Sequence, residues 1–235
     1  MKIEILYNDY LIFGDGANVD YIRACLPEAE FIYTSIHDTP YFAENEPDLI
    51  YMGAMSENNQ ERVIKALMPY RYRLRELIDK GAHILFTSTA CDVLGKYIAE
   101  DDRKVECLGL FDFHVEIQML RRFNAMTLGN YEGIEMMGFK SQFGVAYPSD
   151  ECKEKFFDVT RGSGLNRDCK WEGFKRNNLI ATYIIGPFLV VNPLFTKKWL
   201  SEIAGKEITL PFEELAMECY RARLAEFKDE NRKIE

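Results

Sequence analysis

The stretch that decides the fold runs from Ile84 to Gly95 and reads ILFTSTACDVLG. Its first part is an apolar run typical of a buried strand, and four small residues, Thr87 to Ala90, follow it. Small residues allow a strand to turn sharply into a helix, which lifts one side chain above the edge of a sheet. The pattern predicts an elbow with Ser88 at its apex, and a helix-capping serine is the simpler alternative.

The segments before this stretch alternate between strand and helix patterns. Strands are predicted at residues 2–7, 30–35, 48–52 and 82–87. Helices are predicted at residues 19–26, 56–80 and 90–98. Ser56 is expected to cap the longest of these helices. Strands that alternate with helices form parallel sheets covered on both faces.

The second half has a different pattern. We expect strands with tight turns over residues 111–144, a loop or hairpin over 161–176, a strand over 179–185 and a helix over 192–204. Residues 211–235 are predicted to form a C-terminal helical tail, with acidic residues first and basic residues later, as the helix dipole favours. Because no repeat or low-complexity linker interrupts the chain, residues 1–235 are predicted to form a single domain.

Composition disfavours several classes of function. The net charge is −9, from 29 Lys and Arg against 38 Asp and Glu, so we expect no binding to nucleic acid or to a membrane. The six cysteines form no C-x-x-C pair and the histidines lie apart from them, so neither a metal site nor a cofactor is predicted. The N-terminus lacks the pattern of a signal peptide. A cytoplasmic protein with reduced cysteines is expected.

Five motifs in a fixed order carry a resemblance to a known family. They are IFGDGAN (Ile12–Asn18), DLIYMGAM (Asp48–Met55), CLGLFDF (Cys107–Phe113), MGFKSQFG (Met137–Gly144) and LIATYIIGPFLVVNPLF (Leu179–Phe195). In these motifs the chain resembles the class I glutamine amidotransferases, most closely the glutaminase subunit of lipid II isoglutaminyl synthase and the amidotransferase domain of cobyric acid synthases. The resemblance implies a flavodoxin-like α/β fold, a three-layer sandwich with a mostly parallel central sheet.

The family's reaction requires a cysteine that attacks the glutamine amide, a histidine that moves the proton and backbone N–H groups that hold the oxyanion. Residue-by-residue matching puts Ser88 at the cysteine position and Ile185 at the histidine position. The resemblance also implies a ligand pocket made of Gly53, Ala54, Met55, Thr89, Asp92, Arg122 and Gln142. Among these, Gly53 to Met55 match the oxyanion loop. Arg122 matches the arginine that grips the substrate carboxylate, or else it is a solvated surface arginine.

These two departures remove the groups that transfer the proton. A serine hydroxyl has a much higher pKa than a thiol and needs an adjacent base, which isoleucine cannot be. His83 lies five residues before Ser88, roughly 17 Å away by strand rise. Cys91 is an alternative nucleophile one helical turn beyond the elbow, although packing is the usual role of a buried helix cysteine.

We therefore predict a degenerate amidotransferase-like protein that acts as a non-catalytic or regulatory subunit. The expected partner is a Mur-ligase-like or other ATP-dependent synthetase subunit, and the expected ligand is a small anionic or glutamine-like molecule. One alternative is an active glutamine amidotransferase subunit that supplies ammonia for amidation of a peptidoglycan precursor or of cobyric acid. The other is a serine hydrolase that uses Ser88.

Overall fold

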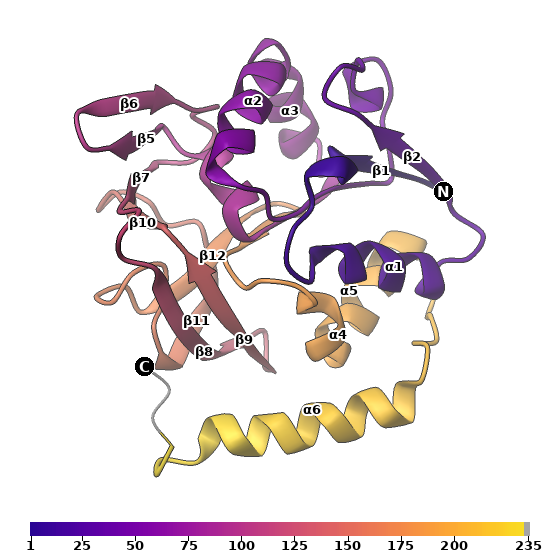
Figure 1. The fold of residues 1–235 in the computed structure, drawn as a ribbon. Coiled ribbons are helices and arrows are strands. Elements are labelled where there is room, and N and C mark those ends of the chain that lie inside the picture. Colours follow the sequence, from indigo (N-terminus) through magenta and orange to yellow (C-terminus); the bar gives the residue numbers. More distant parts are fainter. Residues whose placement is uncertain (233–235) are drawn as a thin grey trace.

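The computed structural model describes residues 1–232, and its main feature is a nine-stranded sheet (Figure 1). The strand order is β2-β1-β3-β4-β13-β12-β11-β8-β9. The first five strands are parallel and follow the 2-1-3-4-5 order of flavodoxin-like sheets. Their bounds are β1 Lys2–Leu6, β2 Glu30–Thr34, β3 Leu49–Met52, β4 His83–Thr87 and β13 Leu179–Thr182. The predicted α/β fold is confirmed.

Four antiparallel strands extend this parallel block. They are β12 Trp171–Arg176, β11 Lys155–Gly162, β8 Phe123–Tyr131 and β9 Ile134–Gln142. Strands β8 and β9 are joined by a two-residue turn, Glu132-Gly133, whose φ angles are 49° and 86°. Two positive φ angles are what a type I′ turn needs, and its twist matches that of the strands it joins.

A second sheet includes residues for which we predicted a helix. Its order is β10-β7-β5-β6, with β5 Tyr97–Glu100, β6 Arg103–Glu106, β7 Phe113–Ile117 and β10 Gly144–Pro148. The helix predicted over residues 90–98 is wrong, because the 3-10 helix η4, Ser88–Leu94, is followed by extended Gly95 and then by β5. Ile98 pairs with Val115 of β7, so pairing with a distant strand outweighs the local helical spacing.

Helices cover both faces of the main sheet and make it the middle of three layers (Figure 1). One face carries α2 Glu57–Leu67 and α3 Arg71–Asp79, and the other carries α1 Asp15–Cys25, α4 Phe188–Val191 and α5 Pro193–Ala204. Alternate residues of β3 point to opposite faces of the sheet and pack into the two hydrophobic cores, one on each face. Ile50 and Met52 join the core under α2 and α3, whereas Leu49 and Tyr51 join the core under α1 and α5.

The helix predicted over residues 56–80 is interrupted. The 3-10 turn η3, Met68–Tyr70, separates α2 from α3 and contains Pro69, which has no N–H to donate. Ser56 precedes α2 but makes no capping hydrogen bond through its side chain. Two other 3-10 turns are η1 Asn8–Tyr10 and η2 Tyr41–Ala43.

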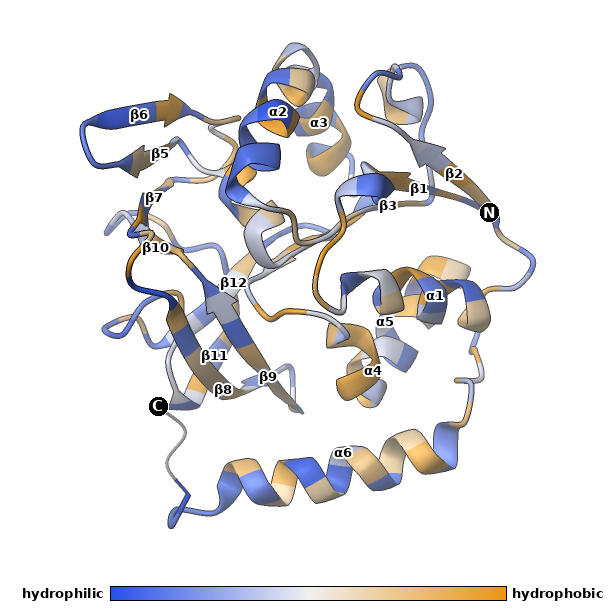
Figure 2. Ribbon diagram, in the orientation of Figure 1, coloured by the Kyte–Doolittle hydropathy of each residue, from blue (hydrophilic) through white to orange (hydrophobic). Residues whose placement is uncertain are grey.

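The tail predicted over residues 211–235 contains α6, Glu213–Lys228, and its last three residues, 233–235, lie outside the described part of the chain. Tyr220 and Phe227 of α6 pack against the β8–β9 hairpin, and the Tyr220 hydroxyl donates to the Glu135 carbonyl at 2.9 Å. Figure 2 shows that α4, which contacts both α1 and α6, is hydrophobic along its length. The tail helix therefore covers the hairpin and the apolar α4.

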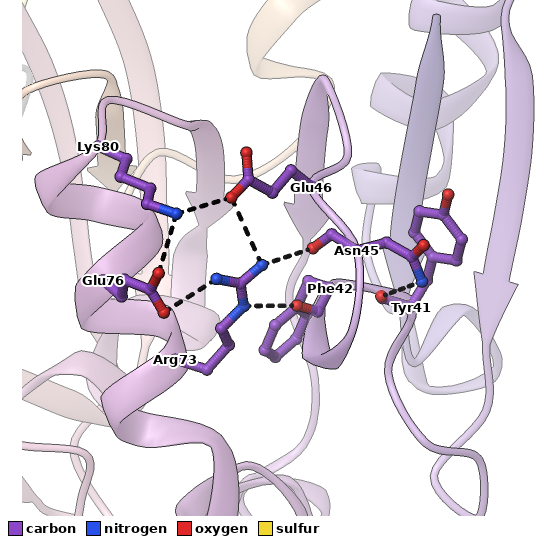
Figure 3. Close-up of polar contacts among 7 residues, drawn as sticks. All are labelled: Tyr41, Phe42, Asn45, Glu46, Arg73, Glu76 and Lys80. Atoms are coloured by element: carbon purple, nitrogen blue, oxygen red, sulfur yellow. Dashed lines mark hydrogen bonds and ion pairs between the residues drawn. The ribbon is translucent and has the colours of Figure 1, made fainter.

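Arg73 ties α3 to the segment that follows β2 (Figure 3). Its guanidinium donates to the carbonyl oxygens of Phe42 at 3.1 Å and Asn45 at 3.0 Å. It also pairs with Glu76 at 2.9 Å and with Glu46 at 3.7 Å. One side chain thus holds the loop after β2 against the helical layer.

Arg73→Ala is expected to lower the free energy of unfolding by about 1–2 kcal/mol, because the Phe42 and Asn45 carbonyls lose a charged donor. Lys80 is the matched control, since it contacts Glu46 and Glu76 only through solvent-exposed ion pairs. Lys80→Ala should therefore destabilise the protein less. Urea unfolding followed by circular dichroism measures both variants, and equal losses would contradict this role of Arg73.

Candidate functional site

The chain turns sharply at Ser88, where β4 gives way to the 3-10 helix η4. Ser88 has a φ of 54°, a left-handed conformation that is strained for a residue with a Cβ atom. A strained residue between a strand and a helical turn is the geometry of a nucleophile elbow. The turn at Ser88 thus has the shape predicted for it.

The Ser88 side chain nevertheless lies in the protein interior. Its exposed fraction is 0%, and Oγ makes no hydrogen bond within residues 1–232. Its neighbours Thr89 and Asp92 are also buried, as are Ala54 and Met55 of the facing loop. A substrate could reach the hydroxyl only if the segments packed over it moved.

The Thr89 hydroxyl forms two hydrogen bonds with the backbone of the loop, Gly53 to Met55, that the resemblance matches to the oxyanion loop. The Met55 N–H donates to Thr89 Oγ1 at 2.8 Å, and the Thr89 hydroxyl donates back to the Met55 carbonyl at 2.8 Å. An N–H that already has a partner is not free to stabilise an oxyanion. Gly53 in the same loop is tightly packed, because a Cβ there would lie 2.7 Å from the Leu11 side chain.

Asp92 lies at the centre of a second group of buried polar side chains. Its carboxylate accepts hydrogen bonds from the Tyr183 hydroxyl and from Gln60 Nε2, both at 2.7 Å. Gln60 Nε2 also donates to the Thr89 carbonyl at 2.7 Å. Burial raises the pKa of Asp92 to about 7, and the two hydrogen bonds oppose that rise. The space expected to hold a ligand is filled by side chains that bond to one another.

Asp15 forms a third polar group directly beside the elbow. Its Oδ1 accepts hydrogen bonds from the Thr87 hydroxyl at 2.5 Å, the Tyr51 hydroxyl at 3.0 Å and Asn18 Nδ2 at 3.1 Å. Its Oδ2 accepts a longer one, 3.4 Å, from the Gly186 N–H. This carboxylate therefore joins the start of α1 to the ends of β3 and β4. Burial raises its pKa, and these donors partly offset the effect.

Ile185 is half-buried and follows β13, the neighbour of β4 in the sheet. Its N–H donates to the Phe139 carbonyl of β9 at 3.0 Å. Ile184 packs directly on the β9 backbone, because a Cβ at Gly138 would lie only 2.2 Å from Ile184 Cγ2. Strand β9 is thereby held against the segment beside the elbow.

Arg122 and Gln142 do not join Ser88 in one open pocket. Arg122 is exposed, donates to Ser141 Oγ at 3.3 Å and places its guanidinium 4.2 Å from the centre of the Phe143 ring. It lines a surface hollow that contains none of the elbow residues. Gln142 is buried, and its Nε2 donates to the Gly144 carbonyl at 2.8 Å.

Cys91, the alternative nucleophile, is fully buried. Its thiol lies 3.2 Å from the Thr182 carbonyl and 3.5 Å from the Phe86 carbonyl and can donate to either. Burial raises the pKa of the Cys91 thiol well above its usual value. Because the thiolate is the reactive form, this environment favours a packing role for Cys91.

Sequence patterns missed four residues that build this region. Asp15 stands in the first motif and Tyr183 in the last, so membership of a motif is the sequence signal for both. Tyr51 looked like an ordinary strand residue and Gln60 like a solvated position on α2. Their burial depends on contacts with distant segments, which local spacing does not reveal.

Two absences concern the described residues, 1–232. They contain no group of three or more histidine, cysteine, aspartate or glutamate side chains placed to hold a metal ion. None of their helices is both long and apolar enough to cross a membrane.

Residues 2–193 match the CobB/CobQ-like glutamine amidotransferase domain. The chain belongs to this family. Over 179 residues it is 30% identical to the GatD subunit of lipid II isoglutaminyl synthase (glutamine-hydrolyzing) from Staphylococcus aureus strain N315. The match covers 76% of this chain and 72% of that relative.

Solved amidotransferases share the fold of this family member. A structure described as a glutamine amidotransferase has a TM-score of 0.54 at 14% identity, covering 86% of this chain and 98% of the other. A glutamine amidotransferase from Thermotoga maritima has a TM-score of 0.53 at 10% identity, covering 97% and 93%. At these identities the likeness concerns the fold alone.

The buried Asp92 should make stability fall as pH rises. Because its pKa is about 7 in the folded protein and about 3.8 as a model value, the unfolded chain releases this proton at a lower pH than the folded one. The protonated Asp92 contributes its full stabilisation below about pH 4. This contribution then falls steadily as the pH rises to about 7. Asp92→Asn removes it, so the variant should gain stability relative to the parent by up to about 1.4 kcal/mol per pH unit.

Urea unfolding of both proteins at several pH values between 4 and 7 measures this difference. A constant gap between the two curves would show that Asp92 titrates normally in the folded state.

Proposed function

We propose that this amidotransferase-like chain is a non-catalytic subunit that acts by binding a ligase-type partner. The observation that carries the proposal is the closed elbow: Ser88 is fully buried, and the facing Met55 N–H already donates to Thr89. The fold is that of an amidotransferase, but the place where glutamine would react is filled with the protein's own side chains.

The chemistry of the candidate groups supports the proposal. Hydrolysis of an amide needs a nucleophile, a base that takes its proton and a donor for the oxyanion. Ile185, at the position matched to histidine, cannot accept a proton. Cys91 is a buried thiol that lies against two backbone carbonyls, with its pKa raised by burial. A serine hydrolase would need a base hydrogen-bonded to Ser88, whereas Ser88 Oγ has no hydrogen-bond partner within residues 1–232.

The relative from Staphylococcus aureus suggests the class of partner. Its name makes it a subunit of a synthase, so it works together with another chain. We infer that the present chain likewise binds a synthetase subunit, of the Mur-ligase-like or a related ATP-dependent type. The name of the same relative includes glutamine hydrolysis. It therefore favours a second candidate function for the present chain, that of an active glutaminase subunit whose elbow opens when the partner binds.

An ammonia-release assay with glutamine separates the two candidates. The purified chain, alone and with a Mur-ligase-like candidate partner, should release no more ammonia than the blank, while an established amidotransferase serves as the positive control. Size-exclusion chromatography of the mixture should show a complex.

Ser88→Ala and Cys91→Ala are the variants that decide this assay. Ammonia release that either substitution abolishes would overturn the non-catalytic assignment and establish the active subunit. Absence of a complex with every ligase tested would contradict the binding role.

A further inference from the structure

A hollow of about 300 Å³ lies on the surface beside β10, and its lining includes neither Ser88 nor Thr89 nor Asp92. The turn at residues 118–122 lines one side of it, and the loop at residues 166–168 lines the other. Its charged side chains are Arg121, Arg122, Arg167, Glu116 and Asp168. A hollow of this size is at the lower end of the range for small-molecule sites.

Two of these arginines have no partner within residues 1–232. Arg121 and Arg167 are exposed, and their side chains make neither an ion pair nor a hydrogen bond in the part of the chain that the structure describes. The protein has a net charge of −9, so carboxylates are in excess. Two unpaired guanidinium groups that line one hollow are well suited to bind an anion such as phosphate.

The two segments that carry these arginines are fixed to the fold. Asn166 Nδ2 donates to the Ala146 carbonyl of β10 at 2.9 Å, and its Oδ1 accepts from the N–H groups of Asp168 and Cys169. In the other segment, the Gln118 N–H donates to the Phe143 carbonyl at 3.2 Å, and the Arg121 N–H closes the turn by donating to the Gln118 carbonyl at 2.8 Å. Held segments reduce the entropy that a ligand must overcome when it orders its site.

The ring of Tyr147 adds a flat surface to the same hollow. Tyr97, His114 and Tyr147 stack across β5, β7 and β10, with centroid distances of 5.0 and 5.6 Å and interplanar angles of 20° and 24°. Tyr147 stands on β10, an edge strand, so no strand of this sheet covers the ring face opposite His114. That side chain is 36% exposed and lines the hollow. A planar ring can stack on such a face.

Glu116 and Asp168 limit which anion can bind. Glu116 lies 3.5 Å from His114, and both carboxylates lie close enough to Tyr147 to add to the rise that burial causes in its pKa. They would repel a bare anion, but they accept hydrogen bonds from hydroxyl groups. The hollow therefore combines donors for an anion, a face for a ring and acceptors for hydroxyls.

We propose that this hollow binds a nucleoside diphosphate. The phosphates contact Arg121 and Arg167, the base stacks on Tyr147, and the sugar hydroxyls face Glu116 and Asp168. A docked protein would need a much larger surface, about 800 Å² on each partner. The site is independent of the closed elbow, so its failure would leave the proposed function untouched.

Isothermal titration calorimetry of the full chain in EDTA tests the site with ADP, inorganic pyrophosphate and adenosine as separate probes. ADP should bind more tightly than either of the others. Arg121→Ala and Arg167→Ala should each weaken ADP binding about tenfold, the loss expected for one charged hydrogen bond. Tyr147→Leu should weaken ADP binding but leave pyrophosphate binding unchanged.

Arg62→Ala is the matched control, because Arg62 is an exposed arginine of α2 that does not line the hollow. It should bind ADP like the parent protein, and circular dichroism verifies that every variant is folded. Absence of ADP binding to the parent would overturn the proposal. So would equal weakening by Arg62→Ala, or tighter binding of a hexaglutamate peptide, which would indicate an acidic protein segment as the ligand.

Discussion

The hydrogen bonds that the buried Asp15 carboxylate accepts are the interactions on which the region around Ser88 depends. A buried carboxylate is costly unless donors surround it, and here the side chains of Thr87, Tyr51 and Asn18 supply them. These donors come from two central strands and from α1, so one group holds the first helix against the ends of the parallel sheet. Because Thr87 immediately precedes Ser88, the same contact also fixes the strand end from which the strained turn begins.

The region around Ser88 combines a strained strand-to-helix turn with buried polar side chains that bond to one another. Thr89 bonds to the Met55 backbone, and Asp92 bonds to Tyr183 and Gln60, so donors and acceptors that could serve a ligand satisfy one another. Such a network is stable only while all its members are paired. This pairing is what the proposed non-catalytic role requires, because it leaves no buried donor of the loop free for a substrate.

The parallel half of the fold could be predicted from the sequence, because its strands are continuous apolar runs separated by helical spacing. The elbow could be predicted as well, from the small residues around Ser88. The strand at Ile98 could not, since it forms by pairing with β7. Pro69 does signal the break between α2 and α3, although the helical spacing continues across it. The sequence leaves Arg122 either in the pocket or on the surface, and the structure puts it on the surface beside Phe143, because local sequence does not determine the path of the turn before β8.

Solvent access to position 88 is the most direct test of a closed elbow. In Ser88→Cys, iodoacetamide labelling of the native protein can be followed by peptide mass spectrometry, with exposed Cys219 and buried Cys91 as internal standards. We predict that Cys219 is labelled rapidly, while the new cysteine and Cys91 react only after unfolding in urea. Labelling of position 88 in the native protein at a rate close to that of Cys219 would show an open elbow and contradict the observation that carries the non-catalytic proposal.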